Sequence, residues 1–169
     1  MRTAIDPKAV AEAIGDAIVA CDASGAIVMW NAGATRMFGF TEDEALGQSL
    51  DIIIPERLRK RHWDGYEKTM ATGITRYGND VLRVPGVDKA GRAMSIAFTV
   101  AMLHADDGKV SAIVSVIRDE TSRFNDDRAL RKRLAELEAR VAQGQPAPPV
   151  QTPALDDGAQ KPTGCPVGH

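Results

Sequence analysis

The sequence predicts an α+β fold, in which a five-stranded antiparallel sheet carries short helices on one face and a C-terminal amphipathic helix follows. Two observations carry this prediction. Two short apolar runs come first, then several capped helical stretches, then three strand candidates. In the second of those three, apolar residues alternate with small or polar ones from residue 94 to residue 102, so one side of that strand faces a core.

The bulk composition fits one soluble domain with appendages. The chain has 169 residues, a net charge of −2 and two cysteines. This charge gives no basic patch for nucleic acid, and no disulfide framework is expected. No stretch approaches the roughly 18–20 consecutive apolar residues of a membrane span, and the N-terminus does not read as a secretory signal. We therefore expect a cytoplasmic protein that binds neither nucleic acid nor membrane.

The N-terminal half begins with a predicted hairpin. Strands over residues 17–22 and 26–31 are joined by an Ala-Ser-Gly turn. Asn31 is placed to cap a short helix that follows it directly. Thr41 and Glu44 have the spacing of a capping box at the start of the next helix.

A longer helix then carries the first candidate site residue. Leu58, His62, Tyr66 and Met70 are spaced by four and so share one stripe of this helix. The His62 imidazole therefore shares a face with apolar side chains that pack on the sheet. A buried neutral histidine needs a partner, which can be iron in a flat apolar cofactor, a backbone carbonyl or water. Trp63, its neighbour, is expected to be exposed at a dimer face.

Three strands complete the sheet. They are predicted at about residues 75–84, ending at a Pro-Gly pair, at 94–102, and at 110–119. The predicted core face of the middle strand holds five apolar side chains: Met94, Ile96, Phe98, Val100 and Met102.

The C-terminal part divides into a helix and a tail. Residues 124–143 are rich in helix formers, with a four-three-four apolar spacing formed by Leu130, Leu134, Leu137 and Val141. Two heptads are marginal alone, so this helix is expected to pack against its twin in a homodimer or back on its own domain. The tail is rich in proline and glycine and is expected to be disordered. The predicted divisions are 1–9, 10–122, 123–143 and 144–169.

Four local motifs make the chain resemble the PAS domain family. They are an Asp-x-x-Gly turn before residues 27–31, the segment WNAGATRMFGFTEDEALG, the turn Asp88–Gly91, and Arg118-Asp119-Glu120-Thr121, which resembles the Asp-x-Thr signature between the last PAS strand and a signalling helix. The resemblance covers about residues 10–122. It implies a PAS fold, whose members bind heme, flavin or small metabolites, or only dimerise.

Within that family, the His62 region resembles the heme-binding PAS sensors of gas or redox state. Their proximal iron ligand is a histidine at this helix position, after an Arg-x-x-His pattern that Arg59 begins here, with a tyrosine four residues later, which is Tyr66. The resemblance implies heme b held by His62 as the metal ligand. It also implies Lys68 and Arg76 as partners of the heme propionates.

The same resemblance assigns Phe98 and Val100 to an apolar wall around a bound diatomic gas, which would be CO, NO or O2. Oxygen-selective relatives carry an arginine on the first of the three late strands. Here the aligned residue is Val81 or Leu82, and Asn79 is the nearest alternative donor. This departure favours CO and NO over stable oxygen binding.

Several alternatives remain open at this stage. A PAS module without heme would dimerise or bind a small metabolite. Met94 or Met102 could supply a second iron ligand, although core packing is the simpler role. The dipeptide Cys165-Pro166 resembles motifs that bind heme transiently. No catalytic motif is recognisable, so sensing or binding is favoured over enzymatic activity, with output through an unknown downstream protein.

Overall fold

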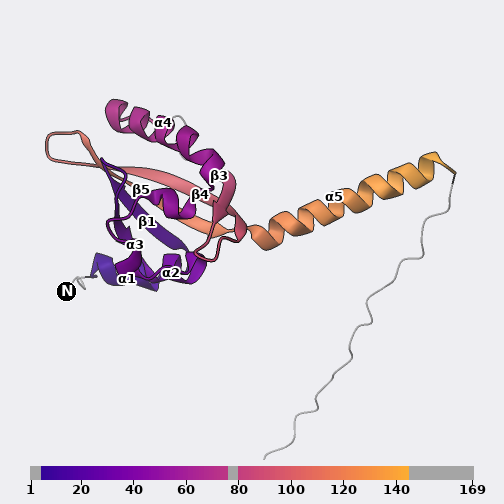
Figure 1. The fold of residues 1–169 in the computed structure, drawn as a ribbon, viewed down its shortest axis with the longest axis horizontal. Helices are drawn as coiled ribbons and strands as arrows, with labels where there is room; N and C mark the ends of the chain where they lie inside the picture. Colours follow the sequence, from indigo (N-terminus) through magenta and orange to yellow (C-terminus); the bar gives the residue numbers. More distant parts are fainter. Residues whose placement is uncertain (1–4, 76–79, 145–169) are drawn as a thin grey trace, which may run out of the picture. The chain divides into compact units, whose positions relative to one another are not determined.

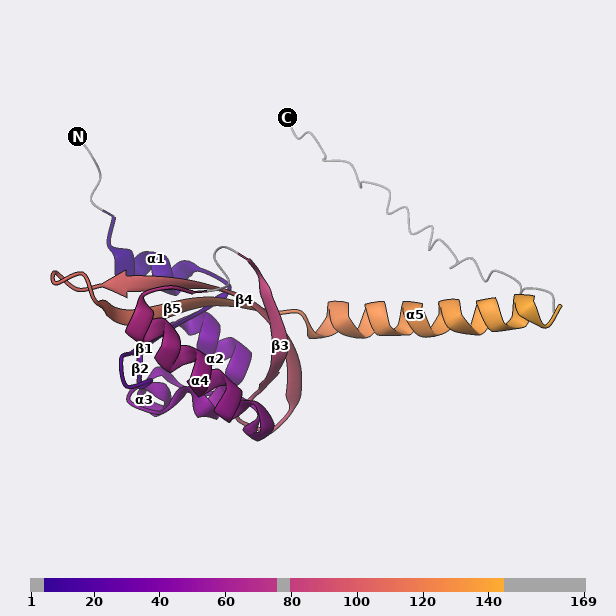
Figure 2. The same ribbon diagram turned by 90° about the horizontal axis from the view of Figure 1, so that it is seen from above.

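The computed structural model describes residues 5–75 and 80–144. Its centre is a five-stranded antiparallel sheet in the order β2-β1-β5-β4-β3, with β2 and β3 at the edges (Figure 1). Helices α2, α3 and α4 lie on one side of this sheet (Figure 2). The predicted fold class is therefore confirmed. The strands are β1 (Ala17–Asp22), β2 (Ile27–Trp30), β3 (Leu82–Val87), β4 (Ala93–His104) and β5 (Val110–Asp119).

The first two strands form the predicted hairpin. The Asp22 carboxylate accepts hydrogen bonds from the backbone N–H groups of Ser24 and Ala26, at 2.8 and 3.1 Å. Gly25 occupies the left-handed region at φ +82°, which glycine adopts without a steric penalty. The Asp-x-x-Gly pattern therefore fixes the turn through one side chain and one backbone conformation.

The short helices begin where their capping residues predict. Asn31 is buried and caps α2 (Ala32–Phe38) by accepting from the Ala34 backbone N–H. The predicted capping box between Thr41 and Glu44 is present at α3 (Glu42–Ala45). The remaining short elements are α1 (Pro7–Ala13) and the 3₁₀ turn η1 (Leu50–Ile53).

The core lies between the sheet and these helices. Trp30, Phe38 and Ile27 are its largest fully buried side chains. The face of β4 predicted from alternation packs against this core with all five of its apolar residues, Met94, Ile96, Phe98, Val100 and Met102. Only Ile96 among the five is fully buried.

Strand β3 differs from the sequence prediction. It begins at Leu82 and runs through Pro85 and Gly86, where the sequence suggested an end. β3 is an edge strand, so a proline that cannot donate a hydrogen bond is tolerated there. Residues 76–79, part of the predicted strand, lie outside the described residues.

The last helix, α5 (Thr121–Ala142), begins directly after the Asp-x-Thr signature. Its predicted apolar stripe is largely exposed on the single chain: Leu130 is 65%, Leu134 57% and Val141 71% accessible. By contact density the chain divides after Ala129, within this helix. In the described part of the chain no helix combines the length and hydrophobicity that a bilayer span needs.

Candidate functional site

Helix α4 (Glu56–Thr72) carries the candidate ligand, and two aromatic side chains anchor it. The Tyr66 hydroxyl is bonded to the backbone carbonyl oxygens of Asp22 and Cys21, at 2.6 and 3.1 Å. The Trp63 ring lies so close to Gly25 that a Cβ there would come within 2.4 Å of it. The helix is thus fixed to the β1–β2 turn.

The indole of Trp63 makes a second anchoring contact. Its Nε1 donates to the Asp51 carboxylate at 2.9 Å, and the Arg59 guanidinium donates to the backbone carbonyls of Ile54 and Asp51. Trp63 is therefore half-buried within its own domain rather than exposed as expected, and its place at a dimer face stays a prediction. The close approach of Trp63 to Gly25 could not be predicted, because the turn and the helix are distant along the chain.

His62 sits beside these anchors, and its ring is only partly covered. The imidazole packs edge-on against Trp63 at 4.7 Å between ring centroids and lies 5.9 Å from the Tyr66 ring. Its Nδ1 is buried and makes no hydrogen bond with any residue the structure describes. Burial lowers the pKa of His62 below its ordinary value of 6.5, opposed by the negative charge of Asp51. The ring is therefore neutral near pH 7 and keeps a lone pair available.

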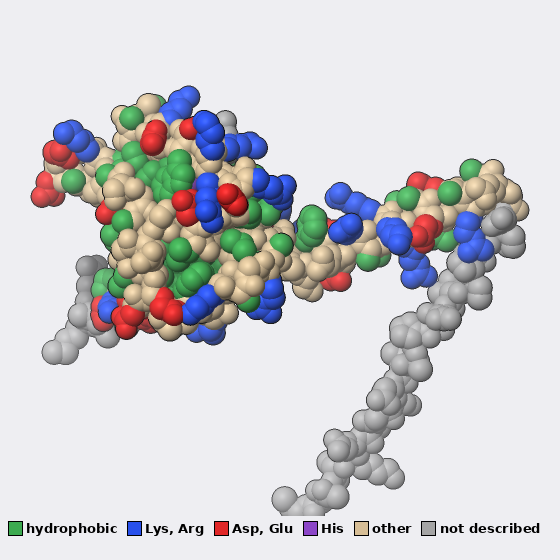
Figure 3. Space-filling view, in the orientation of Figure 1, with side chains coloured by type: hydrophobic (Ala, Val, Ile, Leu, Met, Phe, Trp, Pro, Cys, Tyr) green, Lys and Arg blue, Asp and Glu red, His purple; other side chains and the backbone are tan. Residues whose placement is uncertain are grey.

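The wall opposite the helix is formed by β4 and β5. Phe98 and Val100 pack against the core cluster but are only half-buried. Ser115 on the central strand β5 is also half-buried, although its neighbours Ile113 and Ile117 are fully buried. Beside α4 the surface shows a continuous patch of hydrophobic side chains (Figure 3). We use the name α4 cup for His62 of α4 together with Phe98 and Val100 of β4, the half-buried residues that the sequence predicts on the two sides of a ligand.

The remaining predicted site residues are distributed differently. Lys68 is exposed, near the C-terminal end of α4, and no described residue pairs with it. Tyr66 is buried, with its hydroxyl committed to the β1–β2 turn. Arg76, Asn79 and the Cys165-Pro166 dipeptide lie outside the described residues. The structure therefore brings His62 next to Tyr66, and Phe98 next to Val100.

Ser115 was missed in the sequence. The last strand, VSAIVSVIRD, reads as a buried β-strand, and a serine in such a run is easily taken for a tolerated polar residue. The available signal was the alternation along the strand, because Ile113 and Ile117 lie two residues to either side of Ser115. Placing it needs the pairing with β1 and β4, which the sequence does not reveal.

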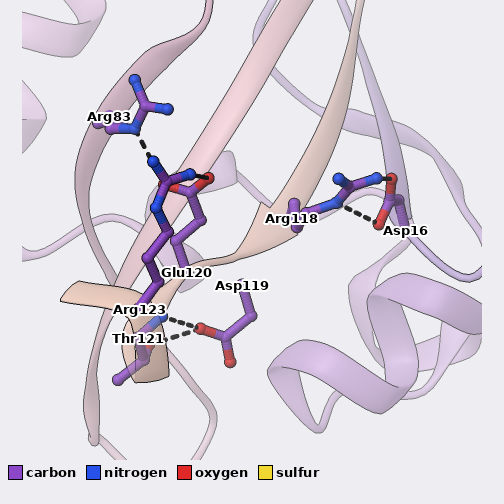
Figure 4. Close-up of polar contacts among 7 residues, drawn as sticks. All are labelled: Asp16, Arg83, Arg118, Asp119, Glu120, Thr121 and Arg123. Carbon is purple, nitrogen blue, oxygen red and sulfur yellow. Dashed lines mark hydrogen bonds and ion pairs between the residues drawn. The ribbon is translucent and has the colours of Figure 1, made fainter. Parts of the chain in front are cut away.

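A network of polar contacts lies where β5 meets α5 (Figure 4). The Asp119 carboxylate accepts from both the backbone N–H and the hydroxyl of Thr121. The Thr121 hydroxyl oxygen in turn accepts from the Ser95 backbone N–H at 3.0 Å. The Asp-x-Thr signature therefore joins the last strand, the first residue of α5 and β4.

Ion pairs surround this junction. Glu120, largely covered, pairs with Arg83 of β3 at 2.9 Å and with Arg123 of α5 at 3.4 Å. Arg118 forms a two-pronged pair with Asp16, just before β1, and this contact lowers the pKa of the Asp16 carboxyl. The start of α5 is thus tied to β3, and the end of β5 to β1, by charged contacts.

Among the described residues no three histidine, cysteine, aspartate or glutamate side chains come together as a metal-binding group. The α4 cup would therefore supply a single side chain to a metal, as one histidine does for a heme iron. The neutral ring with an unpaired buried nitrogen fits that role. Phe98 and Val100, half-buried on β4, would offer apolar surface to a flat cofactor.

Comparison with known proteins places the fold. A family model described as PAS fold matches residues 5–119. An uncharacterized protein of Azorhizobium caulinodans is 28% identical over 118 residues, which is 69% of this chain and 16% of that protein. Sensor protein FixL of Bradyrhizobium diazoefficiens is 39% identical over 59 residues, 35% of this chain and 12% of FixL. The chain thus spans less than a fifth of these curated relatives.

Solved structures agree on the architecture. The PAS domain of a protein from Colwellia psychrerythraea matches with a TM-score of 0.60 at 18% identity, covering 68% of this chain and 93% of that one. A sensory box histidine kinase/response regulator from Burkholderia thailandensis gives 0.54 at 19% identity, covering 74% and 92%. Such identities establish the fold alone. With the family model matching more than half of the chain, this protein belongs to the PAS fold family.

Proposed function

We propose that this PAS domain binds heme b in the α4 cup through His62 and senses a diatomic gas or the redox state of the iron. The single observation that carries the proposal is the buried Nδ1 of His62, which has no partner among the described residues. An unsatisfied buried polar atom costs about 1–3 kcal/mol unless something binds the ring. Heme supplies an iron that accepts an imidazole lone pair and exchanges a gas ligand or an electron.

The protein's own residues prepare the imidazole for this role. Burial keeps His62 neutral near pH 7, and a protonated ring has no lone pair to give. Tyr66 and Trp63 hold α4 on the β1–β2 turn, so the ring position is set by packed neighbours rather than by a loop. Phe98 and Val100 offer apolar surface that keeps water away from a bound gas.

The remaining residues that the resemblance assigns to the cofactor have different proposed roles. Lys68 is exposed and available to pair with a propionate at the rim of the cup, and Arg76 has the same proposed role. We assign Tyr66 to anchoring α4 rather than to direct contact with the cofactor, because its hydroxyl is already occupied.

The route of the signal follows from the contacts of the sheet. Strand β4 carries Phe98 and Val100, and at its other end Ser95 bonds to Thr121 at the start of α5. A change in the cup that shifts β4 therefore acts directly on the first turn of α5. The exposed stripe of α5 then passes the change to a second copy of the chain in a homodimer, and from there to a separate partner protein.

The test is reconstitution of the full chain with hemin, followed by absorption spectroscopy. We expect wild-type protein to show an intense Soret band at one heme per chain, and His62→Ala to lose the wild-type spectrum. His104→Ala is the matched control, since His104 lies exposed at the end of β4 and should leave the spectrum unchanged. Colourless wild-type protein would leave a PAS module that functions without heme. A His62→Ala spectrum identical to wild type would rule out His62 as the iron ligand.

A further inference from the structure

An open cavity of about 540 Å³ lies where strand β3, the start of α4 and the first turns of α5 meet, and we call it the β3–α5 cavity. All of its lining residues precede residue 130, so the cavity belongs to the first of the two units into which the chain divides. Three arginines from three elements line it: Arg57 of α4, Arg83 of β3 and Arg123 of α5. The cavity is separate from the α4 cup, none of whose residues lines it.

The arginines of this cavity carry more positive charge than its own carboxylates neutralise. Arg83 and Arg123 share one carboxylate, that of Glu120, at 2.9 and 3.4 Å (Figure 4). Arg57 is exposed and forms no hydrogen bond or ion pair with any residue that the structure describes. Asp127 is the other carboxylate in the lining, so two negative charges face three positive ones. A guanidinium has several N–H donors, and the cavity therefore keeps charge-assisted donors for an added anionic group.

Apolar side chains line the same cavity, among them Val84, Pro85, Met94 and Phe124. Phe124 is 54% exposed, and exposed aromatic rings beside arginines are typical of protein–protein interfaces. The side chains of Arg83 and Arg123 are 56% and 65% exposed, so an occupant would remain partly in solvent. A small-molecule site encloses most of its ligand. The surface therefore fits a segment of another protein better than a small molecule.

The edge strand β3 limits how such a segment can be held. β3 lies at the end of the sheet, and Pro85 within it has no backbone N–H to donate. Proline is tolerated on an edge strand where its nitrogen faces away from the sheet, so a strand added there would lack a hydrogen bond at this position. Recognition would therefore depend on side chains, with acidic groups on the arginines and an apolar group on Phe124.

We propose that the β3–α5 cavity binds an acidic segment of a partner protein, whose carboxylates contact the three arginines and whose apolar side chain packs on Phe124. The inference names the surface for the separate partner of the proposed function, and rests on that function only for the signal that the contact would carry. Binding itself needs no heme. A carboxylate bound here competes with Glu120 for Arg83 and Arg123. Because Glu120 precedes the first residue of α5, binding would be coupled to the junction between β5 and α5.

The experiment titrates the heme-free full chain into short fluorescent peptides, each of glutamate and leucine in a different order, and measures anisotropy. We expect Arg57→Gln to bind about tenfold more weakly than wild type, the effect of losing one hydrogen bond to a charged group. Arg61→Gln is its matched control, because Arg61 is exposed one turn further along α4 and does not line the cavity. Phe124→Ala should also weaken binding, whereas Leu130→Ala, at an exposed apolar position of the same helix outside the cavity, should not.

Peptides with glutamine in place of glutamate should bind more weakly, and a single-stranded DNA oligonucleotide should not displace the acidic peptides. The proposal is overturned if wild type binds none of the acidic peptides, if Arg57→Gln and Arg61→Gln bind them equally, or if the oligonucleotide displaces them. These outcomes are independent of the heme site. Peptide binding that depends on Arg57, in a protein that takes up no heme through His62, would support this surface while removing the proposed sensing function.

Discussion

The backbone N–H of Ser95 donates a hydrogen bond to the side-chain hydroxyl of Thr121 over 3.0 Å, and so joins β4 to the first residue of α5. The same hydroxyl donates to the Asp119 carboxylate. One threonine thus connects the strand that carries Phe98 and Val100 with the helix proposed for output. In this chain the Asp-x-Thr signature therefore connects β4, β5 and α5 through hydrogen bonds.

Replacing Thr121 by valine keeps the shape of the side chain and removes both contacts. We expect the free energy of unfolding to fall by about 1–2 kcal/mol, because the Ser95 N–H is left without an acceptor. The amide of Ser95 should also exchange hydrogen faster. Denaturant unfolding and hydrogen exchange measure the two effects. Ser122→Ala, one residue along α5, is the control and should change neither the free energy of unfolding nor the exchange of the Ser95 amide. Equal effects of the two variants would show that the Thr121 hydroxyl does not connect β4 with α5.

Tyr66→Phe separates anchoring from cofactor contact. The variant loses the hydrogen bond to the Asp22 carbonyl, and we expect its free energy of unfolding to be about 1 kcal/mol lower than that of wild type. Its heme affinity, measured by titration with hemin, should stay close to wild type because the ring still packs beside His62. A large loss of heme affinity with unchanged stability would instead make Tyr66 a cofactor contact.

The burial of His62 predicts a pH dependence of the heme-free protein. Burial holds the pKa of His62 below 6.5 in the folded chain, with the Asp51 carboxylate, itself near the Arg59 guanidinium, acting in the opposite direction. As pH falls through the unfolded value of about 6.5, the unfolded chain takes up a proton that the folded chain refuses. The contribution of His62 to stability is thus lost on acidification and levels off below the folded pKa.

His62→Gln tests this directly, since it cannot titrate. Urea unfolding at about pH 8 and about pH 5.5 should show that the variant gains stability relative to wild type at the lower pH. His104→Gln serves as the control, and its free energy of unfolding should change between the two pH values by the same amount as that of wild type. A constant difference between His62→Gln and wild type at both pH values would show that the ring is not shielded in the folded state.

The apolar stripe of α5 predicts self-association. Leu130 and Leu134 are 65% and 57% exposed, and such a stripe is buried when two copies pair as a coiled coil. We expect sedimentation equilibrium to give a dimer for wild type and a weaker one for the double variant Leu130→Lys, Leu134→Lys. Arg128→Lys and Arg131→Lys, a charge-preserving pair on the same helix, control for changed surface chemistry. Wild type that stays monomeric at high concentration would rule the stripe out as an interface.

Local signals predicted the elements that local chemistry determines. Asn31, Thr41 and the Asp22 turn were placed correctly because a cap or turn depends on a few neighbouring residues. The alternation along β4 gave its core face for the same reason. These features also carry the PAS resemblance, which the family model confirms for residues 5–119.

The errors and omissions concern contacts between distant segments. Trp63 was expected at the surface, but its place depends on Gly25 and Asp51, which approach only in the folded chain. β3 continues through Pro85 because it is an edge strand, a property of sheet order rather than of composition. The core-side position of Ser115 follows only from its register against Val19 and Val100, which the sequence does not contain.

Resonance Raman spectroscopy of the reconstituted ferrous protein tests the proposed bond between His62 and iron most directly, because it observes the iron–imidazole stretch itself. If His62 holds the iron, this band shifts when the histidines carry ¹⁵N, is absent in His62→Ala and persists in His104→Ala. A band that survives in His62→Ala, or reconstituted ferrous protein that shows no histidine-dependent band, would contradict the assignment of His62.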